Sequence, residues 1–129
     1  MDATKVKLLP TLPPPACAGR LKSDGSFPTP IRPDFEFVVV GPAVSAQAES
    51  AFRVTDWKAK VATAARAHWP AGWPVRMDAV IVRITEFGWS KRRDLDNVAK
   101  PILDAMQGIA YANDRQVREL FARWEHIAG

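Results

Sequence analysis

The sequence predicts an α/β (α+β-like) fold in which a small mixed β-sheet packs against two main helices. Two runs rich in β-branched residues, 35–40 and about 79–87, have the composition of strands, and apolar residues recur at helical spacing in about 50–68 and after Asn97. The chain has 129 residues, 47% of them hydrophobic and 25% charged, as in an ordinary globular domain. It has no apolar run of 18 residues, which excludes a membrane-spanning helix.

The first 34 residues differ in composition from the rest of the chain. They contain seven of the eleven prolines, including Pro13, Pro14 and Pro15. Proline fixes φ and lacks a backbone donor, so it disrupts both helices and central strands. We therefore expect residues 1–34 to form a proline-rich arm or linker with no regular helix and no central strand, and residues 35–129 to form the folded domain.

Two strands are expected in the folded part. The first covers 35–40 and ends at Gly41 and Pro42. The second covers about 79–87, where apolar and polar residues alternate as in a half-buried strand. Its apolar positions are Val80, Val82 and Ile84, and its polar positions are Arg83 and Thr85.

Two helices are expected as well. Ser50 can cap a helix over about 50–68. A second helix should begin close to Asn97, because Pro101 is tolerated only near the first turn of a helix. The spacing of apolar residues in 117–124 slightly favours a helix over a strand there.

Charge and cysteine content limit the classes of function. The net charge is +4 at neutral pH and the pI is about 9.6. This balance suits contact with phosphate groups, but it also occurs in proteins that bind no nucleic acid. Cys17 is the only cysteine, which excludes an internal disulfide and a thiolate metal cage. The N-terminus lacks the features of a secretory signal, so we expect a cytoplasmic protein.

The acidic residues of the C-terminal half can form a metal site. Asp94 and Asp96 are two residues apart, so on an extended chain both carboxylates would point to one side while Leu95 points into the core. Carboxylate oxygens are the ligands that Mg²⁺ prefers. Asp114 could complete the site if the loop before it folds back, and Lys100 could then reach a phosphate group.

Such a site has the chemistry of phosphodiester hydrolysis. A bound metal ion lowers the pKa of a coordinated water and aligns the attacking and leaving oxygens, and a lysine neutralises the growing charge. The basic run of Lys91, Arg92 and Arg93, with Arg115 or Arg118, would contact the DNA backbone.

The same residues also allow a purely structural interpretation. Asp96 or Asn97 could cap the following helix, and Lys100 and Asp104 have the i,i+4 spacing of a surface ion pair. The basic run could be a solvated surface. Both interpretations remain open from the residues alone.

The stretch from Arg93 to Met106, followed by Asn113 to Val117, resembles the RusA family of crossover-junction endodeoxyribonucleases. The shared pattern is an Asp-x-Asp-Asn, a lysine four residues after the second aspartate, an Asp-Ala pair and a late Asp-x-Gln-Val. The resemblance implies a Mg²⁺-dependent enzyme, common in phages and prophages of bacteria, that cuts four-way (Holliday) DNA junctions as a homodimer in recombination and repair. It also implies a strand, and no helix, from about Gln116 to Glu125.

The resemblance implies roles for single residues. By it, Asp94, Asp96 and Asp114 match the metal-binding catalytic aspartates, and Lys100 matches the required lysine. The implied ion is Mg²⁺, with Mn²⁺ as the alternative. The resemblance also implies supporting roles for Asn97 and Asp104.

Two rival functions stay open. One is a metal-dependent nuclease that acts on other branched or duplex DNA without selecting junctions. The other is a non-catalytic DNA-binding module of the same fold, which would tolerate Asp94→Asn and Asp96→Asn. A sugar-nucleotide enzyme is disfavoured because the chain has no glycine-rich segment that could hold a nucleotide.

Overall fold

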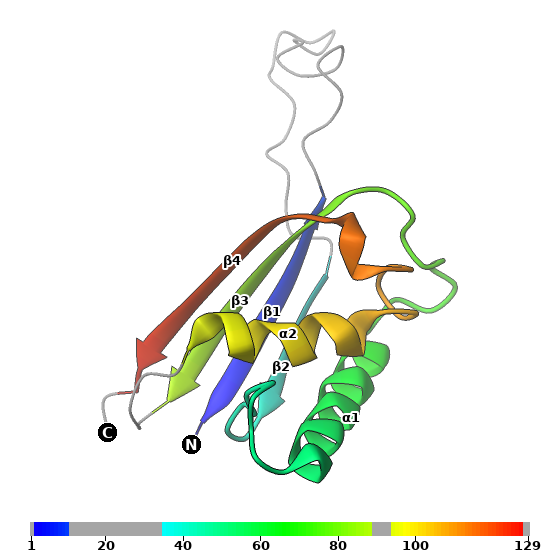
Figure 1. Cartoon of the computed structure of the whole chain (residues 1–129). Helices are drawn as coiled ribbons and strands as arrows, with labels where there is room; N and C mark the ends of the chain where they lie inside the picture. The colour runs from blue at the N-terminus through cyan, green and yellow to red at the C-terminus, as the bar shows by residue number, and fades with distance from the viewer. Residues whose placement is uncertain (1, 11–34, 89–93, 128–129) are drawn as a thin grey trace, which may run out of the picture.

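The computed structural model describes residues 2–10, 35–88 and 94–127, which form one mixed sheet with helices on one face (Figure 1). The strand order is β2-β1-β3-β4. β1 pairs antiparallel with both β2 and β3, and β3 pairs parallel with β4. These pairings confirm the predicted fold class. The elements are β1 (Ala3–Pro10), β2 (Phe35–Val40), α1 (Ala51–His68), β3 (Val80–Gly88), α2 (Leu95–Met106), the 3-10 helix η1 (Asp114–Gln116) and β4 (Val117–His126).

β1 corrects the prediction that residues 1–34 contain no central strand. Residues 3–10 are hydrogen-bonded between β2 and β3. Val6 and Leu8 are fully buried, whereas Lys5 and Lys7 lie on the opposite face. This period-two alternation precedes the dense prolines, and only Pro10 falls within the strand, at its last residue. The remainder of the predicted arm, residues 11–34, lies outside the described residues.

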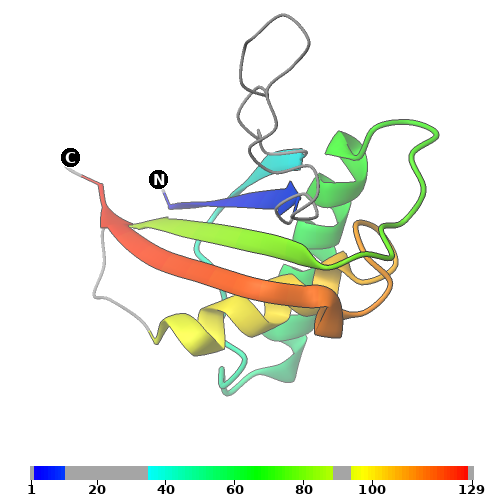
Figure 2. The ribbon, with the colours of Figure 1, turned by 90° about the horizontal axis from the view of Figure 1, so that it is seen from above.

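The core lies between the sheet and the two helices, which cover the same face of the sheet (Figures 1 and 2). Each strand from β1 to β3 contributes alternate apolar residues to it, as a sheet with one solvated face requires. α1 contributes Trp57, Val61 and Ala65, α2 contributes Val98, Ile102 and Met106, and the sheet contributes Val6, Leu8, Phe35, Phe37, Val39, Val80, Val82 and Ile84.

α1 and β3 form where the sequence predicts them. Ser50 is the N-cap of α1, and its hydroxyl accepts a hydrogen bond from the Arg53 backbone N–H at 3.3 Å. The helix ends at His68 as expected. β3 covers 80–88, and its predicted apolar face is buried.

α2 begins two residues earlier than predicted, at Leu95, because Asp94 caps it in place of Asp96 or Asn97. Pro101 therefore lies well inside the helix. Because proline lacks an N–H, it cannot donate to the Asn97 carbonyl four residues before it. The Ala46 backbone N–H donates to that carbonyl instead, at 2.8 Å. The loop before α1 thus compensates for a proline that a helix interior would otherwise exclude.

β4 is a strand, as the family resemblance implies, and not the helix that its apolar spacing favours. It is the last strand of the sheet and is half-buried or exposed along its whole length. An edge strand of this kind shows no clean alternation of buried and exposed residues, so the period-two signal is weak. Within the described residues, no helix is long and apolar enough to cross a membrane.

Candidate active site

The carboxylates at the start of α2 are organised by helix capping. Asp94 Oδ1 accepts a hydrogen bond from the Asp96 backbone N–H at 3.1 Å, and Asp94 Oδ2 accepts one from Asn97 Nδ2 at 3.2 Å. Both Asp94 and Asp96 are exposed. The expectation of an extended chain with Leu95 between two parallel carboxylates is wrong, because the chain is already helical at Leu95.

Asp114 is held by backbone and amide contacts at the start of β4. Its N–H donates to Gln107 Oε1 at 3.1 Å. The Gln116 side chain accepts from the Ala112 and Asn113 N–H groups at 2.9 Å each and donates to the Arg76 carbonyl at 2.8 Å. These contacts fix the short helix η1 and the carboxylate it carries.

Lys100 joins two of the predicted site residues. Its Nζ lies 3.5 Å from Asp104 Oδ1 and 3.9 Å from Asp114 Oδ2. The other oxygen of Asp104, Oδ2, lies 3.4 Å from Nζ of Lys58 on α1. Lysines and aspartates therefore alternate in a surface row of charges, Lys58–Asp104–Lys100–Asp114, in which Lys100 is exposed and the other three residues are half-buried. We call it the charge row. Lys58 could not be predicted from the sequence, because only the packing of α1 against α2 brings it to Asp104.

Tyr111 lies beneath the charge row. It is fully buried, and its hydroxyl donates to the Leu103 carbonyl at 2.7 Å. Burial, together with the negative charges of Asp114 and Asp104, raises the pKa of Tyr111 well above its usual value. The phenol therefore stays neutral and acts as a support for the loop after α2.

The three aspartates predicted as metal ligands do not form a gathered set. α2 begins on the side of the molecule where β3 and β4 end, whereas η1, orange in Figure 1, lies where β4 begins (Figures 1 and 2). Asp114 accordingly meets Lys100. Among the described residues, no group of three His, Cys, Asp or Glu side chains could hold a metal ion. Asp94 and Asp96 fit a hard cation in the chemistry of their donors, but a three-carboxylate cage is not preformed.

The predicted DNA contacts are only partly within the described residues. Arg115 is exposed beside Asp114 on η1. Lys91, Arg92 and Arg93 lie outside the described residues. Asn97 is half-buried and donates to Asp94, so its visible contact is with the cap of α2.

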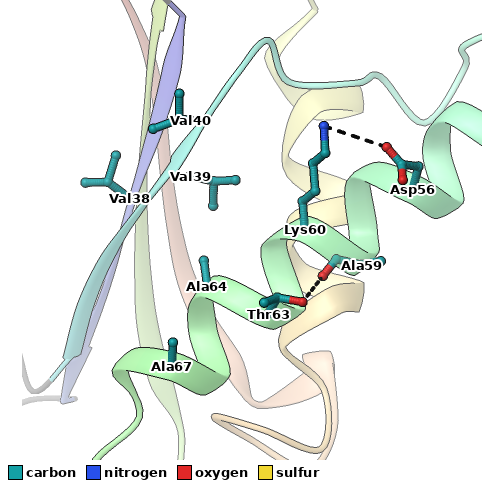
Figure 3. Close-up of a pocket in the computed structure, with 9 residues that line it drawn as sticks. All are labelled: Val38, Val39, Val40, Asp56, Ala59, Lys60, Thr63, Ala64 and Ala67. Atoms are coloured by element: carbon teal, nitrogen blue, oxygen red, sulfur yellow. Dashed lines mark hydrogen bonds and ion pairs between the residues drawn. The ribbon is translucent and has the colours of Figure 1, made fainter.

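A separate hollow of about 390 Å³ lies between β2 and α1 (Figure 3). Val38, Val39 and Val40 line one side, and small residues of α1 such as Ala64 line the other. Its charged lining residues, Asp56 and Lys60, pair with each other at 3.7 Å between Oδ2 and Nζ. None of the predicted site residues lines this hollow, and it offers an apolar surface with no free catalytic group.

Comparison with known families identifies the family to which the chain belongs. The family model described as Endodeoxyribonuclease RusA matches residues 42–128. The chain belongs to the RusA endodeoxyribonuclease family. The match includes both ends of α2 and all of the charge row, and it confirms the resemblance seen in the sequence. No curated protein and no solved structure matched the chain in the other two comparisons.

Proposed function

We propose that this RusA-family chain is a divalent-metal-dependent nuclease that resolves four-way DNA junctions by phosphodiester hydrolysis. The observation that carries the proposal is the family match over 42–128. It contains Asp94, Asp96, Lys100 and Asp114, and all four side chains are exposed or half-buried and can be reached from solvent.

Asp94 and Asp96 are the proposed ligands of Mg²⁺, with Mn²⁺ as the alternative ion. Magnesium keeps several waters and needs only one or two carboxylates together with a substrate phosphate. Asp94 can serve while it caps α2, because a carboxylate has about four lone-pair sites and the cap uses two of them. Asp114 is the proposed third ligand, although it now contacts Lys100. When bound, the metal would supply an activated water and offset charge on the phosphate.

The other residues would bind and orient the DNA. Lys100 is 62% exposed at its side chain, and its ammonium group can contact a phosphate oxygen while Asp104 restrains its position. Arg115 and the basic run Lys91–Arg93 would contact backbone phosphates, which position DNA without reading its sequence. Two copies related by a two-fold axis would present two such sites to one junction in a bacterial, phage or prophage setting.

Cleavage of matched substrates tests this function. We expect Mg²⁺-dependent nicks in opposing strands of a synthetic four-way junction, and little cutting of forked or linear DNA of the same sequence. Asp96→Asn should abolish the nicks, whereas Lys60→Met should leave them unchanged, because Lys60 lines the hollow between β2 and α1 and none of the predicted site residues does. Equal cutting of all substrates would show that the chain is a nuclease without selectivity for junctions, contrary to the proposal. Binding without any cutting would indicate a non-catalytic DNA-binding module.

A further inference from the structure

The face of the sheet away from the two helices carries several cations beside an exposed aromatic ring. The pairing of the four strands places their side chains in two neighbouring rows on this face. The first row is Glu36, Lys7, Arg83 and Phe121, and the second is Val38, Lys5, Thr85 and Arg123. We call these residues the open face. It contains four cations and one carboxylate, so its charge favours an anionic ligand.

Arg83 is the cation of the open face whose charge is least compensated. It is exposed and forms no ion pair with any carboxylate of the described residues. It lies directly opposite Lys7 on β1, and like charges in this position destabilise a pair of strands. Glu36 lies 2.9 Å from Nζ of Lys5 and 3.7 Å from Nζ of Lys7, and it does not pair with Arg83. An anion bound over Lys7 and Arg83 would remove their repulsion.

Phe121 adds a flat aromatic surface to these cations. Its side chain is 49% exposed, and the Arg83 guanidinium lies 5.6 Å from the centroid of its ring. A hollow of about 560 Å³ beside the ring has no acidic residue in its lining, which consists of Arg83, Leu120, Phe121, Ala122 and Arg123. Proteins that bind single strands combine such cations with aromatic rings on which bases stack.

The exposed ring distinguishes unpaired DNA from duplex DNA as the ligand. In a duplex the bases are stacked on each other, and proteins reach only the backbone and the base edges in the grooves. An unpaired base presents its flat face, which stacks on aromatic side chains. The cations alone would attract either form. The half-exposed Phe121 ring among them therefore favours an unpaired strand.

We propose that the open face is a second nucleic-acid site, separate from the cleavage site, and that it binds unpaired DNA. A base stacks on Phe121, one neighbouring phosphate contacts Lys7 and Arg83, and the next contacts Arg123. Arg123 can do this while it pairs with Glu125, because a guanidinium has five donors. The inference rests on the proposed function only in taking DNA as the ligand, and it requires neither a metal ion nor cleavage.

The two sites lie on different sides of the sheet. The charge row is carried by α1, α2 and η1, and both helices cover the face opposite the open face (Figures 1 and 2). A strand on the open face therefore leaves the charge row accessible. The second site would hold an unpaired segment of a branched substrate while the carboxylates at the start of α2 meet another part of it.

The aromatic residues after α1 form the competing surface. Trp73 is 50% exposed, and a hollow of about 320 Å³ beside it has one cation in its lining, Arg66. The Trp69 indole N–H donates to the Trp73 carbonyl at 3.1 Å, and the two rings pack edge to face with their centroids 6.0 Å apart. These contacts hold a folded loop together, and a single cation there gives a weaker attraction for phosphates than the four of the open face.

Fluorescence anisotropy of the full chain with labelled oligothymidylate, in the absence of divalent metal, tests the aromatic part of the site. We expect the wild type to bind the single strand, and unlabelled duplex of the same length to compete poorly. Phe121→Leu should weaken binding by about tenfold or more, because a stacked base loses its platform. Phe121→Trp should retain binding. Phe52→Leu is the matched control, since Phe52 on α1 is 78% exposed and lies outside the open face.

The salt dependence of the same binding tests the cations. Arg83→Gln should lower the slope of log affinity against log salt concentration by about 0.7, the value for one phosphate contact with a single strand. Arg53→Gln is the matched control, because Arg53 is exposed on α1 and should leave the slope unchanged. Circular dichroism of each variant confirms that it is folded. An unchanged slope for Arg83→Gln would contradict the proposed phosphate contact.

Other outcomes would overturn the second site as a whole. One is a wild-type chain that binds no single strand, and another is equal competition by duplex. Loss of binding in Trp73→Leu but not in Phe121→Leu would assign the strand to the surface after α1. If Phe121→Leu changes only the mass of the chain in sedimentation equilibrium, the open face contacts protein and not DNA. A chain that cuts junctions but binds no single strand would keep the proposed function and lose the second site, and the reverse result would do the opposite.

Discussion

At the scale of single residues, Asp94 combines a structural contact with a proposed metal ligand. Its side chain caps α2 through the Asp96 N–H, and asparagine caps helices about as well as aspartate. Asp94→Asn should therefore change the free energy of unfolding by only a few tenths of a kcal/mol, whereas Asp94→Ala should lower it by about 1 kcal/mol. Both should weaken Mn²⁺ binding.

Chemical denaturation and Mn²⁺ titration of the two variants separate these roles. If Asp94→Asn keeps both its stability and its affinity for Mn²⁺, Asp94 is a helix cap and no ligand. A loss of stability in Asp94→Asn equal to that in Asp94→Ala would show that the capping contact depends on the charge.

Lys100 provides a second prediction at this scale. Its ammonium group is the exposed centre of the charge row and is proposed to meet a phosphate group. Lys100→Met should lower the rate of junction cleavage by about 100-fold, as the loss of a donor to developing charge does. Stability should change by less than about 1 kcal/mol, because its ion pairs are at the surface.

Lys60→Met is the control for this prediction, since Lys60 is an equally exposed lysine whose ion pair is with Asp56 alone among the described contacts. Single-turnover cleavage with saturating enzyme measures the rate. A Lys100→Met rate close to that of Lys60→Met would contradict a role for Lys100 in the reaction.

Residue spacing identifies candidate site residues, but it does not predict their contacts. The sequence singles out Asp94, Asp96, Lys100 and Asp114, and all of them lie within the family match. The predicted arrangement of Asp94 and Asp96 is wrong. Two aspartates with this spacing can lie on an extended chain, but here one caps α2 and the other lies in its first turn. The contact of Lys58 with Asp104 cannot be predicted from the sequence, because it depends on how α1 packs against α2.

At the scale of elements, the pairing of β1 with β2 is supported by charges on the open face of the sheet. A side-chain hydrogen bond from Lys5 lowers the pKa of Glu36, and the charge of Lys7 acts in the same direction. A carboxyl whose pKa is lowered by folding stabilises the protein above its unfolded pKa. That stabilisation is lost as the pH falls through the folded pKa.

Glu36→Gln should therefore destabilise the chain at neutral pH and make no difference in acid. The carboxyl is 38% exposed at its side chain, so solvent screening limits the effect to less than about 1 kcal/mol. Urea denaturation of both proteins across the acidic range measures it. A difference that grows as the pH falls has the opposite sign and would contradict the assignment.

The elements also show where sequence patterns succeed and fail. β2, α1 and β3 have clear periodicity and were predicted nearly at their bounds. β1 has the same alternation, but the prolines that follow it obscured the signal. In α2, the Ala46 N–H donates to the Asn97 carbonyl that Pro101 leaves without a helical donor. Because Ala46 is far from α2 in the sequence, no local sequence pattern predicts this hydrogen bond.

At the scale of the whole molecule, the net charge of +4 favours contact with DNA, although it does not by itself show binding. Affinity for a four-way junction should fall linearly on a logarithmic plot against salt concentration, because cations contacting phosphates release counterions. Arg115→Gln should reduce the slope of this plot by about one, since one phosphate contact is lost.

Fluorescence anisotropy with a labelled junction in Ca²⁺ or without metal measures this slope in the absence of cleavage. Arg66→Gln serves as the control, because Arg66 lies on α1 and outside the proposed contact surface. If the slope for Arg115→Gln equals that of the wild type, Arg115 does not contact the DNA phosphates.

The proposed function depends on the exposed carboxylates at the start of α2, which are proposed to bind the divalent ion that cleavage requires. Electron paramagnetic resonance of Mn²⁺ titrated into the full chain tests it most directly, with and without junction DNA. We expect the wild-type chain to bind Mn²⁺ in competition with Mg²⁺, and Asp96→Asn to lose this binding while it stays folded. Equal Mn²⁺ binding by wild type and Asp96→Asn, or none by wild type even with DNA, would contradict it.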